Sequence, residues 1–448
     1  MSARATNSLT DLIREAADPL TGATTDYDPL IEMIGDAHFV LLGEASHGTH
    51  EFYRERAQIT KRLIREKGFT AVAVEADWPD AYRVNRYILG TGPHAQAVDA
   101  LAGFKRFPTW MWRNADVLDF IGWLRSHNDS AQPADKAGFY GLDLYSLYAS
   151  MQAVIDYLNK VDPKAAQQAR ARYACFEHFA EDSQHYGMAA SSHNAVSCEE
   201  EVVQQLVDLQ SRAADYARRD GQVAADEFFS AEQNARLAKN AEEYYRAMFR
   251  GRASSWNLRD RHMAETLGEL AEHLQRRGQR PKLVLWAHNS HLGDARSTQM
   301  SQRGELNVGQ LVRERYDDDA VLVGFTTHAG TVTAASDWDA PAERKRVRPA
   351  LRDSYEALFH QVNLPRFLLT FRDRGRLATT LKEPPRLERA IGVIYLPETE
   401  RQSHYFYAAL PKQFDAVLHF DETRAVEPLE RSAAWETGEA PETFPTGM

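Results

Sequence analysis

Short apolar runs alternate with amphipathic stretches over the N-terminal third of the chain. Apolar runs at 37–42 and 70–74 predict two strands, and the stretch 51–67 between them has helix-forming composition and ends at Gly68, a common helix terminator. A strand, a helix and a second strand in this order form a βαβ unit, whose two strands run parallel. We further expect a strand that ends at Asp143 and helices at 9–17, 77–89 and 115–127.

The chain changes character between residues 146 and 280, where no apolar run has the pattern of a strand. Met263, Leu267, Leu270 and Leu274 recur at intervals of four, three and four residues, which is the amphipathic pattern of a helix. The Phe and Tyr residues of this stretch suit packing in a core, and the alternative is that some of them line a substrate cleft. We interpret the stretch as a helical insertion or cap.

Apolar runs resume after the predicted cap, at 282–287, 321–326, 367–371, 391–396 and 417–420. The sequence therefore predicts an α/β fold with a mostly parallel central sheet flanked by helices, in which the helical cap forms one wall of the cleft. The predicted parts are the N-terminal half of the core at 1–145, the cap at 146–280, the C-terminal half of the core at 281–430 and a flexible tail at 431–448.

The composition is that of an ordinary globular protein, with 43% hydrophobic and 26% charged residues. The net charge of −11 argues against a general nucleic-acid-binding surface, which needs a basic face. Met1–Thr10 lacks the apolar core of a secretory signal, and no apolar stretch approaches the ~20 residues of a membrane span. We expect a cytoplasmic protein with a small-molecule partner and no nucleic-acid or membrane partner, and the composition leaves its oligomeric state open.

The two cysteines lie in a loose Cys/His-rich stretch formed by Cys175, His178, His185, His193 and Cys198. Two cysteines are too few for a disulfide framework and suggest a reducing compartment or indifference to it. Only Cys175 and His178 have a spacing typical of metal ligands, and packing of helices explains the stretch better than a structural zinc site.

Four predicted strands are followed by polar residues that can take part in catalysis. Parallel α/β sheets bind ligands beyond the carboxyl ends of their strands, so these residues are expected to meet in one crevice. This recurrence, more than any single motif, predicts an enzyme. The residues are Glu44 with His47, Glu75, Asp143 and His288. For Asp143, capping of a loop is an equally consistent role.

Each of these clusters has a catalytic and a structural interpretation. A histidine near neutral pKa can take a proton from water, and the carboxylate of Glu44 beside His47 can fix its tautomer, but the same pair can cap a helix N-terminus. Arg56 can donate to a carboxylate or a developing oxyanion, or it can be a surface arginine of its helix. His288 and His291, three residues apart after a strand, suit a metal or a pair of proton-transfer groups, or else one is structural and the other solvated.

Several blocks of the chain resemble the erythromycin esterase family. Residues 43–52, Gly-Glu-Ala-Ser-His-Gly-Thr-His-Glu-Phe, resemble its signature, and Glu75 before Trp78 and the block Trp286-Ala287-His288-Asn289-Ser290-His291 resemble two more of its motifs. Further similarity runs through 138–143, 256–260 and 391–400, and the whole resemblance spans roughly residues 30 to 430. It implies hydrolysis of a lactone ester in macrolide antibiotics by a mechanism usually treated as metal-independent, although many members have no assigned substrate and others carry a label from succinoglycan biosynthesis.

The resemblance also implies the residues of the active cleft, namely two Glu, two His, a further His as general base and an Arg. These match Glu44, Glu75, His288, His291, His47 and Arg56. We therefore predict a hydrolase in which His47 activates a water that attacks an ester or lactone carbonyl, while Glu75 or Glu44 orients the imidazole.

The remaining residues of the cleft have predicted roles in binding. His288, His291 and Arg56 are expected to bind the developing oxyanion or to protonate the leaving alkoxide. Asp143 and Trp78 are expected to contact the substrate.

The prediction requires no cofactor, but the residues leave other mechanisms open. A non-catalytic small-molecule binder is a second class of function, and a serine hydrolase that uses Ser46 or Ser290 is a weaker option. A metal-dependent hydrolase is a further rival, in which Zn²⁺ or Mn²⁺ activates the water. Its ligands would be Glu44, His47, Glu75, His288 and His291.

Overall fold

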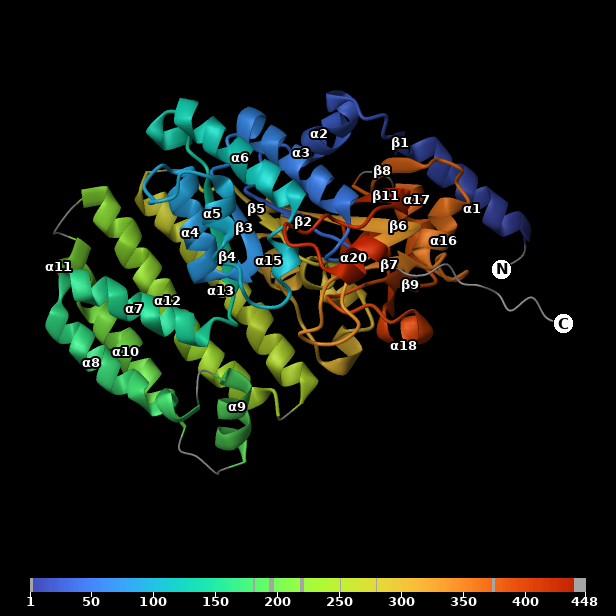
Figure 1. Ribbon diagram of the computed structural model, residues 1–448. Helices are drawn as coiled ribbons and strands as arrows, with labels where there is room; N and C mark the ends of the chain where they lie inside the picture. The colour runs from blue at the N-terminus through green and yellow to red at the C-terminus, as the bar shows by residue number, and fades with distance from the viewer. Residues whose placement is uncertain are drawn as a thin grey trace.

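A large β-sheet runs through the centre of the molecule, with helices on both of its faces (Figure 1). The computed structural model describes residues 3–179, 182–192, 197–217, 221–249, 251–278, 280–372 and 375–438. Within these residues the sheet has nine strands in the order β1-β8-β11-β6-β2-β5-β3-β4, with β7 paired to β6. The strands are β1 (Asp18–Pro19), β2 (Phe39–Leu42), β3 (Ala71–Asp77), β4 (Gly138–Asp143), β5 (Leu283–Trp286), β6 (Ala320–Ala334), β7 (Glu343–Val347), β8 (Arg366–Thr370) and β11 (Ala416–Thr423).

The strands from β11 to β4 are all parallel, whereas β8, β1 and β7 join the sheet antiparallel. A separate antiparallel pair is formed by β9 (Arg386–Arg389) and β10 (Tyr405–Ala408). The prediction of an α/β fold with a mostly parallel sheet is therefore confirmed. Two strand predictions need correction. β6 is much longer than the apolar run 321–326, and 391–396 is not a strand but a segment with isolated bridges to Ser46 and Ala335.

β5 lies between β2 and β3, although it follows both in the sequence. The two strands of the predicted βαβ unit are parallel, as expected, but they do not touch, because each pairs with β5 instead. In the register of the sheet, Trp286 is opposite Leu42 on one side and Val74 on the other. β2 and β5 end at this level, whereas β3 continues to Asp77 and carries Glu75 beside the ends of its neighbours.

The central strands are buried because helices cover both faces of the sheet. In β2, Phe39 and Leu41 face one apolar layer while Val40 and Leu42 face the other, and none of the four is more than 3% exposed. A continuous apolar run rather than an alternating one is typical of a parallel strand buried on both faces. The second layer is covered by α2 (Asp28–Ile34), α3 (His50–Lys67), α4 (Trp78–Ile88), α5 (Ala97–Leu101) and α6 (Ala115–Ser130).

The first layer is covered by helices from the two ends and the middle of the chain. Those outside the predicted cap are α1 (Ala3–Ala16), α15 (Val308–Tyr316), α16 (Tyr355–His360), α17 (Gly375–Lys382) and α19 (Leu410–Gln413). Two short helices, α14 (Asn289–Leu292) and α18 (Glu400–Ser403), lie at the carboxyl edge of the sheet and in the loop before β10.

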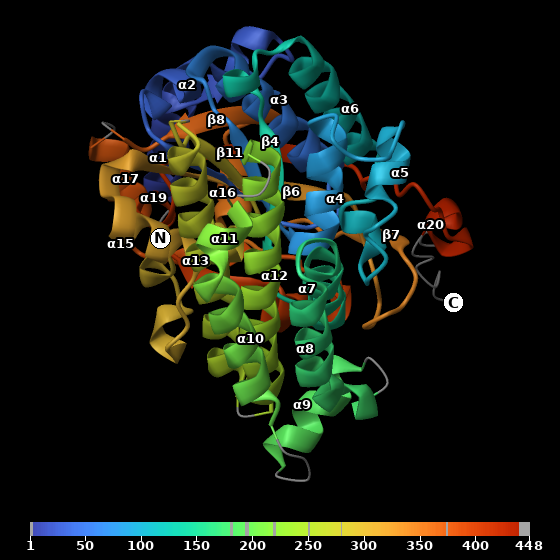
Figure 2. The ribbon, with the colours of Figure 1, turned by 90° about the vertical axis from the view of Figure 1, so that its left-hand side faces the viewer.

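A helical arm extends from the core between β4 and β5, at the lower left of Figure 1 and below the sheet in Figure 2. Met263, Leu267, Leu270 and Leu274 of its last helix are at most 1% exposed, so the predicted amphipathic stripe is a buried one. No strand occurs among the described residues of 146–280. The helices are α7 (Leu147–Val161), α8 (Pro163–Tyr173), α9 (Ser183–Ser191), α10 (Glu199–Ser211), α11 (Ala213–Ala217), α12 (Gly221–Ala247) and α13 (Arg252–Arg276).

Cys175 and Cys198 form a disulfide within this arm. This corrects the expectation that packing of helices alone accounts for the Cys/His-rich stretch. Disulfides persist mainly in oxidising compartments, so the bond does not favour the predicted cytoplasmic location. His193 of the same stretch lies outside the described residues. Along the described ranges we find no helix with the length and hydrophobicity of a membrane span.

The predicted flexible tail is partly structured. α20 (Ala433–Thr437) packs against β7, and Trp435 is 8% exposed and donates from its indole N–H to Thr333 Oγ1 at 2.7 Å. The start of the tail was mistaken for a flexible segment because its few apolar residues give no periodic pattern. Residues 439–448 lie outside the described part of the chain.

Gly48 is required by the close approach of the loop after β2, residues 43–49, to β6. A Cβ atom at Gly48 would lie 1.8 Å from the carbonyl oxygen of Thr333, and the Gly48 carbonyl accepts hydrogen bonds from the amides of Thr333 and Val426. We expect Gly48→Ala to lower the free energy of unfolding by about 2–3 kcal/mol, because backbone must move to admit the methyl group. Denaturant unfolding of the purified variant measures this.

The matched control is Gly122→Ala in α6. No heavy atom lies within 4 Å of a Cβ at that position, so the substitution is expected to raise the free energy of unfolding by roughly 0.5–1 kcal/mol through helix propensity. Equal effects of the two substitutions would contradict the close approach at Gly48.

Candidate active site

The carboxyl edge of the sheet brings together polar residues from the loops after β2 and β5 and from the carboxyl-terminal parts of β3 and β4. His47 and His288 have ring centroids 4.9 Å apart, and Glu75 lies 3.5 Å from His291 and accepts a hydrogen bond from the backbone amide of His288. A cavity of about 700 Å³ opens at this edge. Among the predicted residues, it is lined by His47, Glu75, Asp143, His288 and His291.

Glu44 and Arg56 lie behind His47, away from the cavity wall. His47 Nδ1 is 2.9 Å from Glu44 Oε1, and Arg56 Nη2 is 2.7 Å from Glu44 Oε2. Arg56 is 0% exposed and its guanidinium stacks over the rings of Tyr53 and Trp286. Arg56 was predicted to bind an oxyanion, but in this arrangement it contacts Glu44 instead, and Glu44 in turn fixes the ring of His47.

The negative charges of Glu75 and Glu44 raise the pKa of His47. Burial by itself would lower the pKa of His47, but the carboxylates of Glu75 and Glu44 outweigh burial and raise it above the ordinary value of 6.5. The proton on Nδ1 is held by Glu44, so Nε2 carries the free lone pair when the ring is neutral. Nε2 has no hydrogen-bond partner among the described residues.

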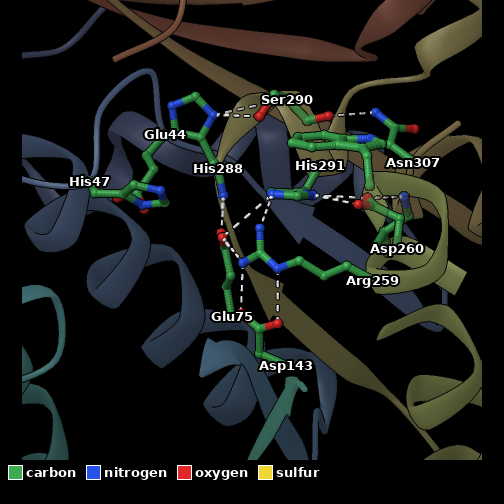
Figure 3. A network of polar contacts seen from close by, with 12 residues as sticks. Glu44, His47, Glu75, Asp143, Arg259, Asp260, His288, Ser290, His291 and Asn307 are labelled. Atoms are coloured by element: carbon green, nitrogen blue, oxygen red, sulfur yellow. Dashed lines mark hydrogen bonds and ion pairs between the residues drawn. The ribbon is translucent and has the colours of Figure 1, made fainter. Parts of the chain in front are cut away.

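Arg259 lies at the centre of the network and was not among the predicted residues (Figure 3). It belongs to α13, and its guanidinium donates to both carboxylate oxygens of Asp143 at 2.9 and 2.6 Å and to Glu75 Oε1 at 2.6 Å. Its third nitrogen is 2.9 Å from His291 Nε2. The arginine therefore joins β3, β4 and the helix that follows β5, and its helix forms one wall of the cavity.

Glu75 is kept ionised by its neighbours. Burial would raise the pKa of Glu75, but neighbouring His291, the positive charges of Arg259 and His47, and the amide of His288 together hold that pKa well below its usual range. A buried carboxylate that is ionised, paired and hydrogen-bonded supplies a fixed negative charge beneath the cavity.

The contacts of His291 determine its tautomer. An arginine N–H can only donate, so His291 Nε2 accepts from Arg259 and Nδ1 carries the proton. Nδ1 donates to Asp260 at 2.9 Å, and Trp256 stacks on the ring with centroids 4.4 Å apart. Asp260, like Arg259, was missed by the sequence analysis. The one available signal was that both residues lie in the block 256–260, which took part in the resemblance without an assigned role.

The contacts of His288 likewise determine its tautomer. The backbone amide of Ser290 donates to His288 Nδ1 at 3.2 Å, and Nε2 donates to the carbonyl of Ile391 at 3.1 Å. Burial, together with the positive charge of His47, puts the pKa of His288 well below its ordinary value. Both ring nitrogens of His288 are thus engaged, as are both of His291.

Trp78 does not line the cavity, although it was predicted to contact the substrate. It is 2% exposed, donates to Ser230 Oγ at 3.1 Å and packs against Tyr140 and Phe229. Trp78 therefore joins α4 to the helical arm. Asp143 does line the cavity, but its two oxygens bind Arg259.

The histidines and carboxylates do not fit a metal site in this arrangement. Both nitrogens of His288 and His291 are used in other hydrogen bonds, and the guanidinium of Arg259 lies between Glu75 and His291. Across the described ranges, no three His, Cys, Asp or Glu side chains are grouped to bind a metal ion. The ligands expected for a metal-dependent hydrolase therefore do not point to one common position.

The sequence family follows from a comparison with known proteins. A model of the erythromycin esterase family matches residues 64–423 of the chain. The chain belongs to the erythromycin esterase family. It is also 24% identical over 329 residues to an Escherichia coli protein named erythromycin esterase type II, an alignment that covers 69% of this chain and 73% of the relative. Family membership supports the prediction of a hydrolase.

Three solved structures have a fold similar to that of this chain. A Bacillus cereus protein has a TM-score of 0.78 at 22% identity, and the match covers 95% of this chain and 99% of that one. A succinoglycan biosynthesis protein has a TM-score of 0.75 at 22% identity, covering 95% and 100%. A histidine-to-asparagine mutant of an erythromycin esterase, in its open conformation, has a TM-score of 0.63 at 18% identity, covering 90% and 94%. At these identities the likeness concerns the fold alone.

The ionised state of Glu75 makes a prediction for acid stability. Because the pKa of Glu75 is lowered on folding, its stabilising effect is present above the ordinary value of 4.5 and is lost as the pH falls below it. In Glu75→Gln the unfolding free energy should be roughly 2 kcal/mol lower at pH 7, where a charged hydrogen bond is lost. It should then decrease less steeply than that of the wild type between pH 4.5 and lower pH.

Denaturant unfolding at a series of pH values measures both effects. Glu398→Gln removes an exposed carboxylate and serves as the control, with a curve expected to follow the wild type. A Glu75→Gln curve that stayed parallel to the wild type over the whole acidic range would contradict the lowered pKa.

Proposed function

We propose that this protein hydrolyses a carboxylic ester or lactone, with His47 as the general base. The observation that carries the proposal is the free Nε2 of His47. Of the three histidines that meet at the carboxyl edge, His288 and His291 use both ring nitrogens in hydrogen bonds, whereas His47 uses only Nδ1. A base must have a lone pair that faces the reacting water, and His47 alone of the three offers one.

The reaction begins with a water placed between His47 and the carbonyl carbon. Its oxygen attacks the carbon while His47 Nε2 takes its proton, and the carbonyl oxygen becomes an oxyanion. When the carbon–oxygen ester bond breaks, the leaving alkoxide takes a proton from the imidazolium, which gives a carboxylic acid and an alcohol, or a ring-opened hydroxy acid from a lactone. Glu44 stabilises the imidazolium through its hydrogen bond to Nδ1.

The other residues of the site act on charge and orientation. Arg259 is the cation that lines the cavity beside His291 and Glu75, and we assign it the stabilisation of the oxyanion that was first expected of Arg56. Arg56 is a positioning residue, because it touches Glu44 and not the cavity. His288 and Asp143 line the cavity with their hydrogen bonds already made.

The substrate is proposed to be an ester or lactone of moderate to large size. A cavity of about 700 Å³ lies in the range of sites that hold drug-sized molecules. The Escherichia coli relative is named an erythromycin esterase, so a macrolide lactone is the first compound to assay. A panel of aliphatic, aromatic and cyclic esters should accompany it, because the relative's name does not fix the substrate of this chain.

His47→Asn is expected to lower kcat by ~10²–10⁴-fold, the usual contribution of a general base. The fold should be retained, because Asn keeps a polar group opposite Glu44, and a thermal melt checks this. His50→Asn is the matched control, since His50 follows on the next turn, pairs with Asp116 and does not line the cavity. Wild-type turnover by a folded His47→Asn protein would show that His47 is not the general base.

The same assays separate the rival mechanisms. Ser290 Oγ lies 2.8 Å from His288 Nδ1, so a serine nucleophile is the one alternative with a geometric basis, and it requires Ser290→Ala to be inactive. Metal-independent catalysis requires activity to survive dialysis against a chelator. Tight binding of panel compounds without any turnover would point to a non-catalytic binder.

The pH profile gives an independent test of His47. The base must be neutral, and the pKa of His47 is raised above 6.5, so kcat/KM should fall as the pH is lowered through that raised value. Glu44→Gln removes one of the negative charges that raise the pKa, so its acidic limb should move to lower pH, with a lower maximum rate. Glu398→Gln is the control with an unshifted profile. An acidic limb that stays in place in Glu44→Gln would show that His47 is not the titrating group.

A further inference from the structure

The cavity is lined by aromatic as well as charged side chains. Two of the aromatic residues belong to segments that are far apart in the sequence. Phe107 comes from the connection between α5 and α6, and Trp338 comes from the turn between β6 and β7. Their ring centroids are 5.0 Å apart and the ring planes are inclined at 60°, so the two segments meet at these rings.

Trp338 is exposed to an extent that core packing does not explain. It is 49% exposed, and of the exposed large apolar residues found along the described ranges it alone lines the cavity. Burying the exposed half of this indole would be favourable, because apolar surface is more stable out of water. An exposed aromatic at the wall of a cavity is the arrangement that ligand contact would complete.

The turn that carries Trp338 is built to hold it in place. The backbone amide of Trp338 donates to the side chain of Asp337 at 2.7 Å, and Asp339 adopts the left-handed conformation with φ of 60°. A non-glycine residue in that region costs energy and is found where a turn or a ligand contact requires it. The conformation of the turn is therefore specified by its own sequence, Asp337-Trp338-Asp339.

The hairpin is also tied, through residues 391–395, to the loop that carries Glu44 and His47. Ala335, at its start, exchanges backbone hydrogen bonds with Val393 and Tyr395, and Ile391 of the same segment donates to the carbonyl of Ala45. The carbonyl of Ile391 accepts from His288. On the opposite side, α20 packs against β7 (Figure 1). These contacts join the base of the hairpin that carries Trp338 to the segment that contacts Ala45 and His288.

We propose that Trp338 and Phe107 form an apolar subsite for a ring or alkyl chain of the substrate, remote from the ester bond. The subsite rests on the proposed function, since it selects among esters that His47 hydrolyses. An indole held at the wall gives flat apolar contact at little entropic cost, so binding of a bulky group there favours large esters over small ones.

Two esters with the same leaving group test the subsite. The ratio of kcat/KM for 4-nitrophenyl octanoate to that for 4-nitrophenyl acetate should fall roughly tenfold in Trp338→Ala, mainly through KM, as expected for loss of one large aromatic contact. Trp338→Phe should restore most of the ratio. Leu396→Ala, which removes an exposed apolar side chain outside the cavity, should leave it unchanged. An unchanged ratio in Trp338→Ala, or equal losses for both esters, would overturn the subsite.

A binding experiment separates failure of the subsite from failure of the proposed function. Calorimetric titration of the His47→Asn protein with 4-nitrophenyl octanoate needs no turnover, and adding Trp338→Ala should raise Kd roughly tenfold. If no ester is hydrolysed but this binding difference is found, the proposed hydrolase fails and the subsite stands. If His47→Asn with an intact Trp338 does not bind the octanoate, the subsite is wrong.

Discussion

The site depends on the position of β5 between β2 and β3. In a parallel sheet, residues at the same level of neighbouring strands lie side by side, and here the register aligns Leu42, Trp286 and Val74. Any other strand order would place His288 and His291 away from His47 or Glu75. The hydrogen-bond ladder of the sheet thus sets the distances on which the proposed proton transfer relies.

A second constraint is that the charges beneath the cavity are buried and have to be balanced there. Glu75 and Asp143 share Arg259, Glu44 pairs with Arg56, and the carboxylate of Asp260 accepts a hydrogen bond from His291. Each pair fixes the other in place, because a buried charge without its partner is costly. The result is a rigid floor in which one ring nitrogen, Nε2 of His47, has no assigned partner within the described residues. Such preorganisation is what general base catalysis at a neutral histidine requires.

Much of this could be predicted from sequence because it depends on local pattern. Continuous apolar runs identified the buried strands, and the polar residues after them identified Glu44, His47, Glu75 and His288. The sequence did not reveal which side chains of a helix point toward the site. Arg259 and Asp260 sit in the interior of a long helix, where charged residues are usually solvated, and only the packing of α13 against the sheet edge turns them inward. The predicted roles of Arg56 and Trp78 in the cleft are wrong because both side chains are buried. The residues next to them in the sequence do not indicate that Arg56 points beneath Glu44 or that Trp78 points into the core.

The late position of β5 in the chain has a consequence for how the protein is made. When a ribosome has released β2, β3 and β4, the strand that joins them is still far from being synthesised, and the whole helical arm emerges first. The nascent chain must therefore keep two strands with unpaired edges from associating with other chains until β5 arrives to fill the gap. Cellular production should accordingly be more sensitive to chaperone supply and to translation speed than the extensive core of the finished protein would suggest.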